Sequence, residues 1–248
     1  LGPRVTAPTS LAMVHIEDGI PSYSFYREGT AERLVTLDSL SKNLTSEVSI
    51  FHIGSLALTG GKDALVWEEF VKITRENNVK VSLDPNVRPS LIAEPDVYRQ
   101  RIKNLITEVD ILKLSDEDLL WLFNDSADET NALAELEVIT NAELLIVTRG
   151  AQGSAVFHGK KWHELPSHPL KKLSDTVGAG DTFMASILAW LVKNEKLNQL
   201  ALLELHEKTD LLHYAGKAAA LNCEKQGCNP PWENELLKYM KNTCRPLI

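Results

Sequence analysis

The sequence predicts an α/β protein with a mostly parallel central sheet flanked by helices. Short apolar runs recur along the chain at residues 48–52, 79–83, 109–114 and 144–148. Segments with helical periodicity alternate with them, at residues 62–77, 95–108, 116–123 and 129–140. Near-continuous Val, Ile and Leu runs are typical of strands covered on both faces, and strand–helix alternation is typical of right-handed parallel crossovers.

Two antiparallel pairs are expected beside these parallel strands. Residues 9–16 and 22–27 alternate in polarity around an Asp18-Gly19 turn, which indicates a hairpin. A second pair is expected at residues 153–158 and 161–165, and the chain then becomes helical from about residue 180 to 241. We therefore expect a small β flap with an edge strand at residues 1–30 and one α/β domain at residues 31–248.

Composition narrows the class of partner. The 248 residues, 44% hydrophobic and 24% charged, suit a globular protein with a sizeable core. A formal net charge of -8 disfavours nucleic acids and anionic membranes, which need a broad basic face. The three cysteines have no metal-knuckle spacing and are expected to be reduced thiols in the cytoplasm. We find no apolar run of transmembrane length and no leader pattern, and the chain begins at Leu1.

In open α/β sheets, ligands bind beyond the carboxyl ends of the strands. Polar residues gather after each of the four apolar runs, at residues 54–55, 84–88, 115–118 and 148–153. These positions are where binding or catalytic side chains are expected.

The turn Gly178-Ala179-Gly180-Asp181 comes directly before the helical stretch 182–193. Small residues at a helix start let a ligand approach the free N–H groups and the positive end of the helix dipole, so the turn can hold an anion. Asp181 adjoins the same turn, where a carboxylate can accept the proton of an attacking hydroxyl. The alternative is an ordinary loop in which Asp181 is only a helix cap.

The longer run of residues 175–183, Asp-Thr-Val-Gly-Ala-Gly-Asp-Thr-Phe, resembles the C-terminal motif of ribokinase-like (PfkB) carbohydrate kinases. Phe25-Tyr26-Arg27-Glu28 and residues 84–89, Asp-Pro-Asn-Val-Arg-Pro, resemble the fructokinase and 2-keto-3-deoxygluconate kinase branch. Residues 113–118 resemble the family's Asn/Ser-x-x-Glu element, with Asp118 in place of the usual Glu. Residues 148–153 are similar to its nucleotide loop.

This resemblance implies a three-layer ribokinase-like fold with a β lid, and ATP-dependent phosphorylation of a small sugar. Fructose is the preferred acceptor, and 2-keto-3-deoxygluconate is the alternative. From another functional class, a catalytically impaired nucleotide-binding fragment also fits. P-loop, dinucleotide-binding and hydrolase-elbow motifs are absent from the sequence.

The resemblance also implies roles for individual residues. Asp181 would be the base, and backbone N–H groups in the turn Gly178, Ala179, Gly180 and Asp181 would hold the phosphoryl charge. The implied ATP contacts are Ser115, Thr148, Gly150, Gly153 and Gly180, and the implied sugar contacts are Tyr26, Arg27, Arg88 and Asp181. Arg88 could equally form a structural ion pair.

Two metal sites are implied in the same way. Asp118 would lie near Mg²⁺ through a water molecule, since Mg²⁺ keeps several waters. A monovalent cation such as K⁺ would bind among Asp175, Val177, Asn222, Lys225 and Gly227. The alternative for this last segment is a plain helix end closed by Gly227.

Family members normally carry an N-terminal segment with a Gly-Gly pair and an Asn that grip the sugar, before the region that matches Thr9. Only residues 1–8 precede that region here. We therefore expect a weakened or absent sugar site, an exposed sheet edge prone to association in this chain, and a homodimer in the intact protein.

Overall fold

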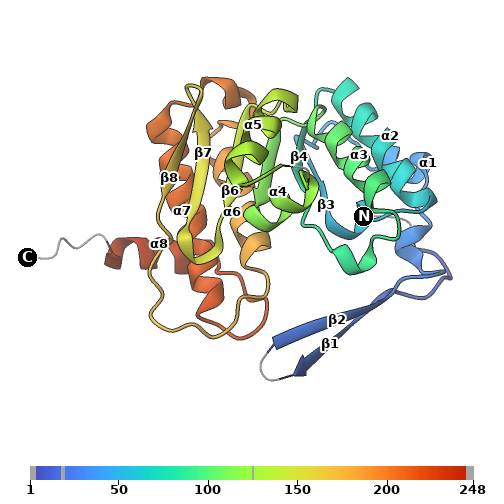
Figure 1. Cartoon of the computed structure of the whole chain (residues 1–248), viewed down its shortest axis with the longest axis horizontal. Coiled ribbons are helices and arrows are strands. Elements are labelled where there is room, and N and C mark those ends of the chain that lie inside the picture. Colours follow the sequence, from blue (N-terminus) through green and yellow to red (C-terminus); the bar gives the residue numbers. More distant parts are fainter. Residues whose placement is uncertain (1–3, 18–19, 125, 244–248) are drawn as a thin grey trace, which may run out of the picture. The chain divides into compact units, whose positions relative to one another are not determined.

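The structure is a computed structural model that describes residues 4–17, 20–124 and 126–243. Within these residues, β1 and β2 form a small antiparallel sheet, and β3-β4-β5-β6-β7-β8 form a mixed, mostly parallel sheet in that order (Figure 1). The predicted α/β class is confirmed. The chain divides into two compact units, Leu1–Val109 and Asp110–Ile248, which are described in turn.

The first unit holds the hairpin and one parallel strand pair. β1 (Leu11–Glu17) and β2 (Ile20–Tyr26) pair with Leu11 opposite Tyr26, which confirms the hairpin, although its predicted Asp18-Gly19 turn lies outside the described residues. β3 (Ile50–Gly54) and β4 (Lys80–Asp84) are parallel and are joined through α2 (Lys62–Glu76). The remaining elements are η1 (Ala31–Arg33), α1 (Leu37–Ser41), η2 (Ser55–Leu58), η3 (Pro89–Leu91) and α3 (Pro95–Ile106).

Aromatic side chains link β3 to α2. The ring of Phe51 lies 6.1 Å from that of Trp67 and 5.2 Å from that of Phe70, measured between centroids. Such pairs add to the stability gained by burying the rings. The face of α2 that carries Phe70 also buries Ala64 and Val71, as the helical periodicity predicts.

The second unit continues with parallel and then antiparallel strands. β5 (Ile111–Ser115) and β6 (Leu144–Thr148) are parallel, whereas β7 (Ser154–His158) and β8 (Lys161–Leu165) follow in antiparallel pairing. α6 and α7 lie side by side (Figure 1). The other elements run as α4 (Asp116–Leu122), α5 (Glu129–Ile139), η4 (Gly150–Gln152), α6 (Ala179–Lys193), η5 (Leu197–Leu202), α7 (Leu205–Cys223) and α8 (Glu233–Thr243).

The predicted boundaries differ from the structure by small shifts. β3 and β5 each begin two residues after the start of the predicted apolar run. The short helix α1 was not predicted, because five residues are too few to show a helical period. None of the helices in the described ranges has the length and apolar character that crossing a membrane requires.

Gly54 ends β3 at a point where only glycine fits. A Cβ at this position would lie 1.8 Å from the backbone oxygen of Asp84, its register partner on β4. The two backbones therefore set the spacing at the carboxyl ends of these strands.

We predict that Gly54→Ala destabilises the protein by roughly 1–3 kcal/mol, the usual cost of overpacking. Gly216→Ala is the matched control, because Gly216 lies inside α7 and an added Cβ would contact nothing there. The free energy of unfolding of that control should rise by roughly 0.5–1 kcal/mol. Urea denaturation of both variants measures the difference, and equal unfolding midpoints would contradict the packing argument.

Candidate active site

The amino end of α6 forms a tight turn at the predicted anion site. Gly178 precedes the helix in the left-handed conformation, with φ 75° and ψ 8°, which glycine adopts without steric cost. A Cβ at Gly178 would lie 2.3 Å from Sγ of Cys228. Because the first N–H groups of a helix lack intrahelical acceptors and carry the positive end of its dipole, this turn suits an anion.

The predicted catalytic residues occupy successive positions in this turn. Asp181 is exposed and lies in the first turn of α6. The N–H of Ala179 donates to the carbonyl of Thr176 at 3.1 Å, so it is engaged within the turn itself. Gly180 is the second helical residue, where the N–H has no acceptor within its own helix.

A buried lysine on β5 lies next to the same turn. Lys113 is only 3% exposed, and its Nζ lies 3.4 Å from the place that a Cβ would take at Gly180. The lysine charge and the helix dipole therefore act on the same space. No role was predicted for Lys113. Its position between the apolar residues Leu112 and Leu114 of β5 is the signal that could have revealed it.

Two residues predicted to bind ATP, Ser115 and Thr148, are register partners at the carboxyl ends of β5 and β6. Ser115 also caps α4, because its Oγ accepts a hydrogen bond from the N–H of Asp118 at 3.0 Å. In return, Oδ2 of Asp118 accepts one from the N–H of Ser115 at 3.2 Å. This capping box fixes the predicted Mg²⁺ residue Asp118 beside Ser115.

Gly150 and Gly153 shape the loop after β6 for different reasons. Both have positive φ, 49° and 106°, and the N–H of Arg149 closes the loop onto the carbonyl of Gly153 at 2.8 Å. A Cβ at Gly153 would lie 2.1 Å from the carbonyl oxygen of Leu165, whereas one at Gly150 would meet open space. Packing against the end of β8 thus requires Gly153, and the open side of the loop lies at Gly150.

Hydrogen bonds bring together four of the residues predicted around a monovalent cation. The carboxylate of Asp175 accepts from the N–H groups of Val177, at 2.9 Å, and Gly227, at 3.0 Å. Nδ2 of Asn222 donates to the carbonyl of Val177 at 2.8 Å. The bonds from Val177 and Gly227 lower the pKa of Asp175 below its ordinary value of 3.8.

The donor atoms of this segment suit an alkali cation in part. The carboxylate of Asp175 and the carbonyl of Val177 are oxygen donors of the kind that bind K⁺. The ammonium group of Lys225 pairs with Glu235 at 3.3 Å, so Lys225 could offer only its carbonyl. Nowhere in the described ranges do three or more His, Cys, Asp or Glu side chains form a metal-binding group.

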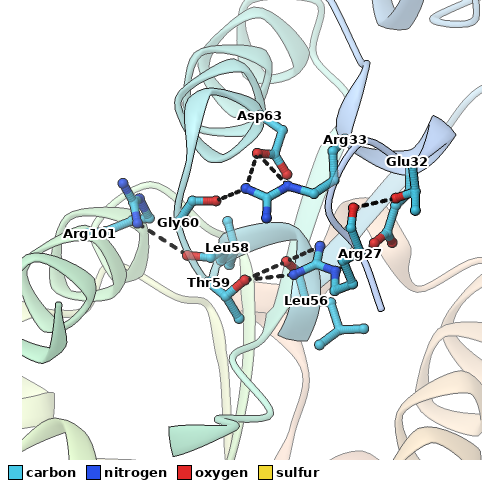
Figure 2. Close-up of polar contacts among 10 residues, drawn as sticks. Arg27, Glu32, Arg33, Leu56, Leu58, Thr59, Gly60, Asp63 and Arg101 are labelled. Atoms are coloured by element: carbon cyan, nitrogen blue, oxygen red, sulfur yellow. Dashed lines mark hydrogen bonds and ion pairs between the residues drawn. The ribbon is translucent and has the colours of Figure 1, made fainter. Parts of the chain in front are cut away.

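In the first unit, the predicted sugar residues Tyr26 and Arg27 line a cavity of about 750 Å³. Arg27 is buried, and Figure 2 shows its guanidinium group among Glu32, Leu56 and Thr59. It donates to Oγ1 of Thr59 and to the carbonyl of Leu56, both at 2.8 Å, and it pairs with Glu32 at 2.5 Å. Arg27 thus ties the end of β2 to η2.

Two further arginines, Arg33 and Arg101, line the same cavity and were not predicted. Arg33 pairs with Asp63 at 2.8 Å and donates to the carbonyl of Gly60 at 2.9 Å. Arg101 pairs with Glu68 and donates to the carbonyl of Leu58 at 3.2 Å. Arg101 shares the buried face of α3 with apolar side chains, and an arginine on such a face is the sequence signal for it.

Arg88 is not among the residues that line this cavity. Its Nη1 donates to Oδ1 of Asn86 at 2.7 Å and to the carbonyl of Val87 at 3.0 Å. These bonds fold the guanidinium group back onto the loop after β4.

We predict that Asp175→Asn loosens the link between the turn before α6 and the loop after α7. Because its pKa is lowered in the folded state, the carboxylate stabilises the fold above pH 3.8. This stabilisation is lost as the pH falls through the lower pKa of the folded state. The melting temperature of the wild type should therefore exceed that of the variant at neutral pH, and the gap should close in acid. Asp210→Asn, an exposed change on α7, is the control. A gap that stays constant into acid would refute this account.

Comparisons with known proteins show which family the chain resembles. The chain matches the family described as pfkB family carbohydrate kinase over residues 4–235. It is 35% identical over 201 residues to a fructokinase of Rhizobium leguminosarum bv. trifolii, covering 81% of this chain and 60% of that protein. It is 30% identical over 239 residues to probable fructokinase-5 of Arabidopsis thaliana, covering 95% and 72%. The chain thus spans 60% of the length of the Rhizobium relative.

Solved structures show the same fold. A fructokinase with bound ATP from Xylella fastidiosa is similar with a TM-score of 0.85 and 26% identity, covering 98% of this chain and 76% of that one. An aminoimidazole riboside kinase from Salmonella enterica shares the fold alone, with a TM-score of 0.74 and 19% identity over 88% of this chain and 71% of that one. The predicted ribokinase-like fold is confirmed, and the chain belongs to the pfkB family of carbohydrate kinases.

Proposed function

We propose that the chain is an ATP-dependent sugar kinase that transfers the γ-phosphoryl group to a hydroxyl of fructose. The observation that carries this proposal is the α6 turn, where Gly180 lies beside the Nζ of Lys113 and Asp181 is exposed one residue later. Phosphoryl transfer needs positive charge around the transferred group and a base for the attacking hydroxyl. The names of the two relatives above favour fructose as the acceptor.

Three residues of the second unit would share the chemistry. Asp181 accepts the proton of the acceptor hydroxyl, a role that its exposed carboxylate supports. The N–H of Gly180 and the α6 dipole stabilise the charge on the equatorial phosphoryl oxygens. Lys113 adds a fixed positive charge, and because it is buried, its position is held by the surrounding core.

Ser115, Thr148, Gly150 and Gly153 would bind ATP at the carboxyl ends of β5 and β6. Mg²⁺, when bound with ATP, neutralises phosphate charge and orients the transferred group. Asp118 would hold it through water, which fits a carboxylate already engaged in the cap of α4. The K⁺ site is proposed at Asp175 and the carbonyl of Val177, supported by their oxygen donors.

Tyr26, Arg27 and Arg88 are the proposed contacts of the acceptor sugar. Arginine donates hydrogen bonds to sugar hydroxyls, but it also pairs well with carboxylates. For this reason 2-keto-3-deoxygluconate is the second candidate acceptor.

We further propose that the intact protein is a cytoplasmic homodimer. The hairpin exposes Leu11, Met13, Val14 and Tyr26, each between 49% and 62%. Two-stranded sheets are marginal alone, so a second copy would stabilise this one by covering it. Free Cys223 and Cys228 suit a reducing compartment.

Loss of the proposed base gives the first test. Asp181→Asn should lower the phosphoryl-transfer rate by about 10²–10⁴, the usual contribution of a general base. ATP affinity, measured by calorimetry, should change little, because the backbone of the turn is kept. Asp210→Asn serves again as the surface control. Near-normal turnover by Asp181→Asn would remove this residue from the mechanism.

A panel of acceptors with coupled ADP detection tests the proposed function as a whole. We expect fructose to stimulate ADP release most strongly, ahead of 2-keto-3-deoxygluconate. A clear preference for a nucleoside would overturn both acceptors. ATP binding without ADP release for any sugar would identify the chain as a nucleotide-binding fragment.

A further inference from the structure

Every arginine that lines the 750 Å³ cavity is already paired with a carboxylate. Figure 2 shows Arg27 beside Glu32, Arg33 beside Asp63, and Arg101 bonded to the carbonyl of Leu58. Glu28 and Glu94 line the cavity as well. Carboxylates therefore outnumber guanidinium groups around this space, and a cavity that looks basic from its arginines has no excess of positive charge.

The pair Arg27–Glu32 is the one that bears on the acceptor. Arg27 is 9% exposed, and the carboxylate of Glu32 lies 2.5 Å from its Nε. Its Nη1 donates one N–H to Oγ1 of Thr59, and its Nη2 donates one to the carbonyl of Leu56. An arginine has five N–H donors, so these three bonds leave two on a residue that lines the cavity.

These contacts decide what kind of ligand Arg27 can recognise. A hydroxyl oxygen can accept a hydrogen bond, and the two remaining N–H groups are donors. A ligand carboxylate needs uncompensated positive charge, and beside Arg27 it would meet the carboxylate of Glu32. Repulsion between these two like charges disfavours binding of an acidic ligand, and it therefore acts on specificity more than on the affinity for a neutral sugar.

We infer that Glu32 determines acceptor specificity: by neutralising Arg27, it makes the cavity accept a neutral sugar and reject a six-carbon sugar acid. This inference rests on the proposed function, since it assigns the substrate class of the same acceptor site. Glu32 is a positioning residue, because it acts through Arg27.

The test compares fructose with 2-keto-3-deoxygluconate in the full chain, by kcat/KM and by calorimetric binding without ATP. In the wild type, the acid should bind at least about tenfold more weakly than fructose, a difference of about 1.4 kcal/mol. Glu32→Gln keeps the size of the side chain and removes its charge. This variant should raise the acid-to-fructose ratio, in kcat/KM and in binding affinity, by about tenfold. Glu32→Asp, which keeps the charge, should restore the wild-type ratio.

Glu28→Gln is the matched control, because it removes the same charge from an exposed residue of the same cavity. It should change the ratio by no more than about twofold, since only Glu32 contacts Nε of Arg27 in the described structure. An equal shift in Glu28→Gln and Glu32→Gln would overturn the inference in favour of a general charge effect. So would a wild type that binds the acid as tightly as fructose, a result that needs no variant to fold.

Failure of the proposed function gives a different pattern. If neither sugar releases ADP from the wild type, the kinase proposal fails. The acid-to-fructose ratio of binding affinities, compared between the wild type and Glu32→Gln, then still decides the role of Glu32. Calorimetry of the sugar alone does not depend on phosphoryl transfer.

Discussion

The carboxylate of Asp175 holds the segment from which the α6 turn begins. It accepts N–H groups from Val177, just before the turn, and from Gly227, in the loop after α7. Asn222 adds a bond to the carbonyl of Val177 and accepts one from the N–H of Asn229 at 2.8 Å. The position of Gly178, and with it the direction of the helix dipole at Gly180, depends on these bonds, because a loop without them would be free to move.

Backbone packing sets a second constraint on the site regions. At Gly54, Gly153 and Gly178 an added Cβ would collide with Asp84, Leu165 and Cys228 respectively. Each of these glycines lies at a strand end or a helix start. The chain therefore uses glycine at these three positions because two segments approach closely there, whereas an added Cβ at Gly150 would meet open space.

Much of the architecture could be predicted from local patterns. Apolar runs placed β4 and β6 almost to the residue, and the Gly-Ala-Gly-Asp sequence placed the start of α6 within three residues, because turn and cap preferences act within a few residues. Strand ends also brought the predicted pair Ser115 and Thr148 together, since parallel neighbours end at the same edge of a sheet. The five-residue helix α1 gave no such pattern and was missed.

The sequence by itself therefore determined the fold class and the place of the glycine-rich turn before α6, both of which follow from short-range preferences and residue order. Only the tertiary structure decided which groups the long charged side chains contact. Arg27 finds Leu56 and Thr59, 29 and 32 residues along the chain, and Lys113 reaches Gly180 from another strand–helix segment. Long side chains with many donors can pair with numerous partners, so burial and packing, not spacing, select the ones that are used.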